Sequence, residues 1–160
     1  MAEILFMIHG MCGGAWVWDG YRSFFETRGY RCLAPTLRHH EVAPGRAPPR
    51  ELGTTGLLDY VADLAAEIEQ LGAAPILVGH SMGGLLAQIL SSRVRCKALI
   101  LLGSAPPAGI LAFRPAQIAA FGSVLARWGW WRQPIRPTFR EAARGMLGGL
   151  PAPDQRRTYE

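Results

Sequence analysis

The sequence predicts an α/β protein with a mostly parallel sheet and helices on both of its faces. Short, continuously apolar runs alternate with segments in which apolar residues recur every three or four positions. Continuous apolar runs are typical of strands buried on both faces, as in parallel sheets, and the wider spacing is typical of helices. The 160 residues fit one domain by size, and 49% of them are hydrophobic, which is enough for a buried core.

Four strands and three helices are predicted over the first two thirds of the chain. The strands are expected at residues 3–8, 30–34, 75–79 and 97–102, and the helices at residues 18–28, 56–71 and 82–93. Gly29 and Gly72 follow the first two helices, at a position that glycine favours. Ligands bind beyond the carboxyl ends of the strands in such sheets, so the residues after each strand are candidates for a site.

One of these strand ends carries a G-x-S-x-G pattern. Its residues are Gly79, His80, Ser81, Met82 and Gly83, directly after an apolar run. Between a strand and a helix this pattern holds a serine on a sharp turn, the nucleophile elbow, and its two glycines let the turn close. The free N–H groups at the start of the next helix would face an oxyanion formed at the serine. A flexible serine–glycine turn is the alternative interpretation of the motif alone.

The first strand leads into a second glycine-rich loop. The loop begins with His9, Gly10, Met11, Cys12, Gly13 and Gly14. Its glycines let the backbone curl so that one N–H points back at the serine. This H-G-x-C-G-G-A-W-x-W run, together with the G-x-S-x-G pattern, resembles the α/β-hydrolases, and within them the small plant esterases, the hydroxynitrile lyases and their bacterial relatives. The resemblance covers residues 4–104.

The resemblance implies a serine hydrolase that cleaves a carboxylic ester. It makes Ser81 the nucleophile and the backbone N–H groups of Met11 and Met82 the oxyanion donors. The residues that shape the two loops would be His9, Gly10, Gly79, His80 and Gly83. It implies a small-molecule ester as substrate, with no cofactor and no metal. Hydroxynitrile-lyase-like or acyltransfer chemistry on the same scaffold stays open, as does a non-catalytic or inactive truncated protein of the hydrolase fold.

The proton acceptor that Ser81 needs is not evident. A serine nucleophile requires a base within hydrogen-bonding reach and an acid that orients the base. The family order is serine, acid, histidine, whereas all four histidines precede Ser81: His9, His39, His40 and His80. His39 and His40 lie at the correct sheet edge and are the alternative base, and Cys12 is an alternative nucleophile. We expect the acid and the histidine on a companion C-terminal segment that also carries the missing strands.

Residues 1–104 are predicted to form the N-terminal part of the hydrolase core, and residues 105–160 an incomplete helical cap. Prolines become frequent after Ser104, and helices are expected at residues 115–128, at residues 137–147 and from Asp154. In the family this position holds a cap over the active site, whose large apolar groups would favour a substrate with an apolar moiety. Alternatively, the aromatic residues of this segment fill the cap's own core.

The net charge of +5 arises entirely in the last third of the chain. Residues 105–160 hold eight arginines and three acidic residues, whereas residues 1–104 hold nine basic and nine acidic residues. These arginines either attract an anionic substrate or surface, or form solvated helix faces. Nothing resembles a nucleic-acid-binding module. No apolar run reaches the ~18 residues of a membrane span. Without a signal peptide or a disulfide framework, the sequence predicts a cytoplasmic protein.

Overall fold

The computed structural model describes residues 2–43, 46–110, 122, 126, 128, 129 and 132–159. The chain forms two compact units, one of residues 1–41 and 55–109, the other of residues 42–54 and 110–160. Residues 42–54, which the sequence analysis placed in the N-terminal part, therefore belong to the second unit. The assignment of the two parts to a hydrolase core and a cap stays a prediction.

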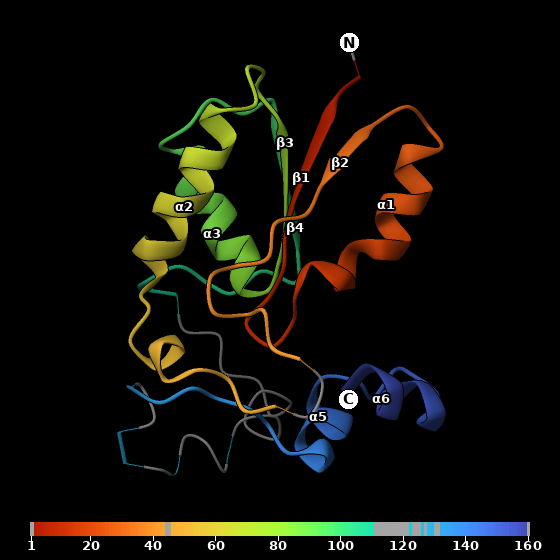
Figure 1. The fold of residues 1–160 in the computed structure, drawn as a ribbon, viewed down its shortest axis with the longest axis vertical. Helices are drawn as coiled ribbons and strands as arrows, with labels where there is room; N and C mark the ends of the chain where they lie inside the picture. The colour runs from red at the N-terminus through yellow and green to blue at the C-terminus, as the bar shows by residue number, and fades with distance from the viewer. Residues whose placement is uncertain are drawn as a thin grey trace. The chain divides into compact units, whose positions relative to one another are not determined.

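Four parallel strands form the sheet of the first unit, in the order β2-β1-β3-β4 (Figure 1). Their bounds are Ile4–Ile8 for β1, Arg31–Leu33 for β2, Ile76–His80 for β3 and Ala98–Leu102 for β4. Each lies within one residue of its expected bounds, so the predicted strands are confirmed. The two central strands are β1 and β3, and their carboxyl ends carry the two loops that the motifs indicated.

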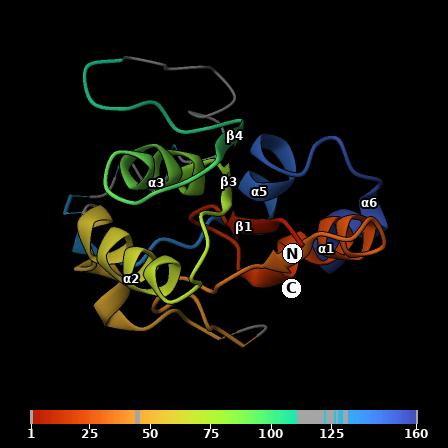
Figure 2. The same ribbon diagram turned by 90° about the horizontal axis from the view of Figure 1, so that it is seen from above.

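Helices cover both faces of this sheet, as predicted. They are the 3-10 helix η1 (Ala15–Trp18), α1 (Asp19–Glu26), α2 (Leu57–Glu69) and α3 (Met82–Ser91). In both ribbon views α1 lies on one side of the sheet, and α2 and α3 lie on the other (Figures 1 and 2). The helix expected from residue 18 thus begins with a 3-10 turn, and α2 and α3 are each two residues shorter than expected at their carboxyl ends.

The side chains of β1 alternate between the two faces of the sheet and contribute to a separate hydrophobic core on each face. Successive side chains of a strand point to opposite faces. Leu5 and Met7 accordingly pack with Trp18 on the α1 side. Phe6 and Ile8 pack with the buried residues of α2 and α3 on the other side. Because all five β1 side chains are buried, the strand is fixed in register and direction, and so is the start of the loop that follows it.

The second unit contains the 3-10 helix η2 (Arg50–Gly53), α5 (Phe139–Gly145) and α6 (Ala152–Tyr159). Thr138 begins α5 with a capping box, because its side chain accepts from the Glu141 N–H while the Glu141 carboxylate accepts from the Thr138 N–H at 2.8 Å. The predicted helix over residues 137–147 is confirmed as α5. The last helix begins two residues before Asp154, and η2 was not predicted. The helix expected over residues 115–128 falls mostly outside the described residues.

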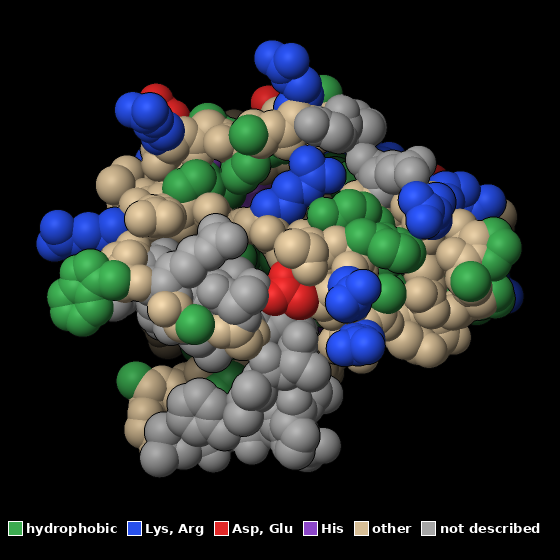
Figure 3. All heavy atoms as spheres, turned by 90° about the horizontal axis from the view of Figure 1, so that it is seen from below, with side chains coloured by type: hydrophobic (Ala, Val, Ile, Leu, Met, Phe, Trp, Pro, Cys, Tyr) green, Lys and Arg blue, Asp and Glu red, His purple; other side chains and the backbone are tan. Residues whose placement is uncertain are grey.

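Several arginines of the second unit contact groups within that unit. Arg136 lies over the ring of Tyr159 at 5.4 Å, and Arg156 lies over the ring of Phe139 at 5.0 Å. Arg157 pairs with Asp154 at 2.9 Å. Basic side chains form separate groups on the face shown in Figure 3. For Arg136, Arg156 and Arg157 these contacts favour the interpretation as partnered surface groups. No helix in the described ranges is both long and apolar enough to cross a bilayer.

Candidate active site

Ser81 occupies a strained corner between β3 and α3. Its backbone angles are φ +54° and ψ −120°. This positive-φ conformation is unfavourable for a residue other than glycine, by about 1–3 kcal/mol. The Ser81 N–H donates to the carbonyl of Leu102 at 3.1 Å, and its carbonyl accepts from the N–H of Ala105 at 2.8 Å. The end of β4 therefore holds the strained residue from both sides.

Gly79 and Gly83 allow the backbone segments at this corner to touch. A Cβ on Gly79 would collide with the carbonyl of Gly83, and a Cβ on Gly83 would collide with the carbonyls of Ile8 and His9. The first turn of α3 thus lies directly against the end of β1. A side chain at either glycine would push α3 away from the sheet and open the corner at Ser81.

The loop after β1 approaches Ser81 closely. β1 and β3 are paired up to Ile8 and Gly79, so the residues that follow them are neighbours. A Cβ on Gly10 would be 3.1 Å from the Cβ of Ser81. Ser81 is partly exposed. Among the hydrogen bonds of the described residues, none uses the Ser81 hydroxyl or the N–H groups of Met11 and Met82.

His9 is fully buried and ties two loops together. Its Nε2 accepts from the N–H of Leu37 at 3.0 Å, and its Nδ1–H donates to the carbonyl of Gly10 at 2.8 Å. Burial lowers the pKa of His9 from 6.5 to about 4, against the raising effect of the bond to Gly10. The ring is therefore neutral at pH 7, with its proton on Nδ1. His9 thus joins the glycine-rich loop to the loop after β2, and its role in shaping the site stays a prediction.

The other histidines take different positions. His40 lies with its Nε2 3.0 Å from the carbonyl of Met11. His39 adopts a positive φ of +65°, and His80 ends β3 with an exposed side chain. Among the hydrogen bonds of the described residues, none joins a histidine ring to Ser81. The contact of His40 with the glycine-rich loop was missed in the sequence analysis, although its position after a strand at the same sheet edge was a signal for it.

Cys12 is not suited to act as a nucleophile. The residue keeps an exposed surface. Packing around its sulfur nevertheless removes water from the thiol and raises the pKa of Cys12 to about 11. The thiolate is the reactive form, and at pH 7 this cysteine is almost wholly protonated. This disfavours the alternative in which Cys12 replaces Ser81.

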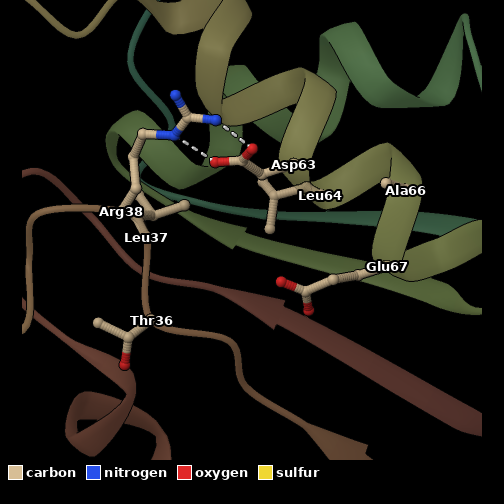
Figure 4. A pocket seen from close by; sticks show the side chains of 7 residues that line it. All are labelled: Thr36, Leu37, Arg38, Asp63, Leu64, Ala66 and Glu67. Atoms are coloured by element: carbon tan, nitrogen blue, oxygen red, sulfur yellow. Dashed lines mark hydrogen bonds and ion pairs between the residues drawn. The ribbon is translucent and has the colours of Figure 1, made fainter.

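A separate hollow of about 340 Å³ lies between α2 and the loop after β2 (Figure 4). Its lining includes Arg38 and Leu37 from the loop, and Asp63 and Glu67 from α2. The Arg38 guanidinium binds both oxygens of the Asp63 carboxylate. Burial raises the pKa of Glu67. The hollow holds none of the predicted site residues, but the ion pair anchors the loop that carries His40. Within the described residues, no group of three His, Cys, Asp or Glu side chains could hold a metal ion.

Comparison with known proteins assigns the chain to one family. Residues 5–160 match the model of the alpha/beta hydrolase family. The chain belongs to the alpha/beta hydrolase family. Esterase PIR7B of Oryza sativa subsp. japonica is 34% identical to it over 108 residues, which are 63% of this chain and 38% of the relative. Methyl jasmonate esterase 1 of Vitis vinifera is 30% identical over 89 residues, 54% of this chain and 33% of the relative.

Solved structures agree on the fold. An extracellular alpha/beta-hydrolase from a Paenibacillus species has a TM-score of 0.77 at 19% identity. The match covers 98% of this chain and 64% of the Paenibacillus chain. A pyrethroid hydrolase from Sphingobium faniae has a TM-score of 0.54 at 27% identity. That match covers 72% of this chain and 47% of the pyrethroid hydrolase. The chain thus spans less than half the length of the two curated relatives, both of which are esterases by name.

Proposed function

We propose that this chain carries the nucleophile and the oxyanion donors of a serine esterase. The Ser81 Oγ attacks the acyl carbon of a carboxylic ester, and the N–H groups of Met11 and Met82 donate to the resulting oxyanion. Loss of one such donor typically costs about 3 kcal/mol of barrier. Breakdown of the tetrahedral intermediate releases the alcohol and leaves an acyl group on Ser81, and water then releases the acid.

One observation carries this proposal: a serine with φ +54° lies beside the glycine loop of the neighbouring strand. Backbone strain of this kind is retained where the surroundings enforce it, and it gathers at functional sites. A serine in an ordinary turn would need neither this strain nor the two glycines that the corner requires. The partial exposure of Ser81 leaves its hydroxyl within reach of a substrate.

We further propose that a segment outside these 160 residues supplies the triad acid and histidine. No histidine follows Ser81 in the sequence. Within the described residues β4 lies at the edge of the sheet, and the side chains of Ile100 and Leu101 are 43% and 41% exposed. An apolar edge strand invites pairing with another strand. A companion segment that added strands beside β4 would cover these side chains and bring the missing groups to the carboxyl edge.

The proposed substrate is the methyl ester of a small carboxylic acid with an apolar moiety. The names of several relatives support this choice, since they are called methylesterases or a methyl jasmonate esterase. The Met11 side chain, which is 37% exposed, offers an apolar surface next to the proposed oxyanion donors. No cofactor is needed, because acyl transfer through serine uses only side chains, backbone N–H groups and water.

Labelling with a fluorophosphonate probe tests the proposal. The probe is applied to the intact native protein and to the 160-residue chain, each with and without Ser81→Ala. We expect a covalent adduct on Ser81 in the intact protein, its loss in the variant, and little labelling of the 160-residue chain alone. Hydrolysis of a methyl ester should yield the acid and methanol.

Each other result has a definite meaning. An intact protein that does not label at Ser81 would be a non-catalytic member of the family, and the esterase proposal would be wrong. Release of an aldehyde and cyanide from a cyanohydrin, without ester cleavage, would establish the lyase alternative. Full labelling and esterase activity of the 160-residue chain by itself would disprove the companion segment.

A further inference from the structure

We propose that His40 is a positioning residue for the oxyanion donor at Met11. With His9 it holds the two peptide groups that flank Met11, one histidine on each side. This inference rests on the proposed function for its catalytic consequence. The geometry on which it stands involves neither Ser81 nor the triad groups.

The first peptide group is the one that carries the Met11 N–H. Its carbonyl belongs to Gly10 and accepts from the Nδ1–H of His9 at 2.8 Å and from the N–H of Gly13 at 3.2 Å. None of the described peptide bonds is cis, so the N–H of this group points away from its carbonyl. Two donors on the Gly10 carbonyl therefore fix the direction of the Met11 N–H.

The second peptide group carries the Met11 carbonyl, and His40 holds it. The Nε2 of His40 lies 3.0 Å from this carbonyl, and its Nδ1 lies 3.0 Å from the carbonyl of Arg38. Both carbonyls only accept, and a neutral imidazole carries one N–H, so the ring donates to one of them at a time. We assign the proton to Nε2, which then donates to the Met11 carbonyl. Once both flanking groups are held, Met11 cannot rotate about its backbone bonds without losing hydrogen bonds to a histidine.

The two histidine rings support each other. Their centroids are 5.2 Å apart in an edge-to-face arrangement, and the ring of Tyr60 lies on His40 in the same manner at 5.6 Å. His9 reaches from the β1 loop to Leu37, and His40 reaches from the β2 loop back to Met11. The connection between the loops is thus reciprocal. Each loop supplies one ring and one backbone partner.

Helix α2 fixes the segment from which His40 extends. Leu37 is 2% exposed, Arg38 binds Asp63 through both carboxylate oxygens, and Tyr60 is 4% exposed beneath the His40 ring. The positive φ of His39 turns the chain between the Arg38 anchor and His40. Helix α2 therefore positions the Met11 carbonyl through Arg38 and His40. The local turn at Gly10 positions it as well.

Three variants of the intact native protein test the inference. His40→Leu removes both ring nitrogens, His40→Gln restores a side-chain N–H donor, and His39→Asn is the matched control because asparagine tolerates a positive φ. The readouts are the maximal rate and the half-saturating concentration of fluorophosphonate labelling at Ser81, and deuterium exchange of the backbone amides at residues 11–14.

We expect His40→Leu to lower the maximal labelling rate about tenfold or more, with the half-saturating concentration little changed, since a displaced donor weakens transition-state stabilisation. Amide exchange at residues 11–14 should rise in the same variant. His40→Gln should recover most of both properties, and His39→Asn should match the native protein. Native labelling and exchange in His40→Leu would overturn the inference, and so would an equal loss in all three variants.

The test separates this inference from the proposed function. If the native protein does not label at Ser81, the esterase proposal fails, and the exchange measurement alone decides the role of His40. Faster exchange at residues 11–14 in His40→Leu, with recovery in His40→Gln, would then support the positioning role. Unchanged exchange would disprove it.

Discussion

The two loops that meet at the candidate site are held in place by different means. The Ser81 corner is fixed by backbone groups, since its N–H and carbonyl bond to Leu102 and Ala105 and its glycines touch carbonyls. The loop of residues 9–14 is fixed largely by side chains, because His9 and His40 hold the carbonyls of Gly10 and Met11. The proposed nucleophile is therefore held by the backbone of the sheet, and the proposed oxyanion donor is positioned by residues on another loop.

This difference predicts which residues are essential to the fold and which affect only the reactivity of the site. A change at the corner must move α3 or the end of β1. A change of His40 should leave the sheet intact, because the contacts of its ring are with the two loops and with Tyr60. Substitutions in the β2 loop should therefore affect reactivity more than stability, whereas substitutions at the corner should affect both.

Gly83→Ala should have the largest effect. The added methyl group would collide with the carbonyls of Ile8, the last residue of β1, and of His9, which follows it. Both residues are fully buried, so these carbonyls cannot move freely. We expect the free energy of unfolding to fall on the order of 4 kcal/mol, with loss of labelling at Ser81. Denaturant unfolding of the 160-residue chain measures the first effect, and fluorophosphonate labelling of the intact protein measures the second.

Gly20→Ala is the matched control for that experiment. Gly20 lies in the first turn of α1, and nothing approaches within 4 Å of an added Cβ. Alanine is favoured over glycine in a helix by about 0.5–1 kcal/mol, so this variant should be unchanged or slightly more stable. Similar losses in the two variants would show that the backbone contacts of Gly83 are not what holds the corner.

Acid should weaken the side-chain support of the glycine-rich loop. His9 has a pKa of about 4 in the folded protein, against 6.5 for an unperturbed histidine. Below pH 6.5 the unfolded chain therefore binds more protons at this residue than the folded chain, and stability falls as the pH drops toward 4. We expect His9 to contribute a loss of about 2 kcal/mol between pH 7 and pH 5.

Two measurements on the 160-residue chain check this expectation. Denaturant unfolding at a series of pH values gives the loss of stability, and an NMR titration of the imidazole signals gives the pKa of His9 directly. A His9 titration near 6.5 would contradict the neutral, buried ring on which the support of Gly10 depends.

Much of the fold was predictable because its signals are local. The four strands are continuous apolar runs, and the turn at Ser81 requires glycines at fixed spacing, so a short window of sequence contains the information. The contact of His40 with Met11 joins residues 29 apart and depends on how two loops pack, which no local pattern records. The placement of residues 42–54 with the second unit was missed for the same reason.

The smallest expected effect concerns the ion pair that anchors the β2 loop. Arg38 and Asp63 have side chains that are 43% and 37% exposed, and exposed ion pairs contribute little because water and salt screen them. A double-mutant cycle of Arg38→Gln and Asp63→Asn should give a small coupling free energy that decreases in high salt. The pair Arg22–Asp19, at 3.9 Å and with side chains 42% and 69% exposed, is the control and should show less coupling. Equal coupling in the two pairs would mean that the bidentate geometry does not stabilise the loop. In that case the buried Leu37, its hydrogen bond to His9 and the contact of Tyr60 with His40 would hold the β2 loop.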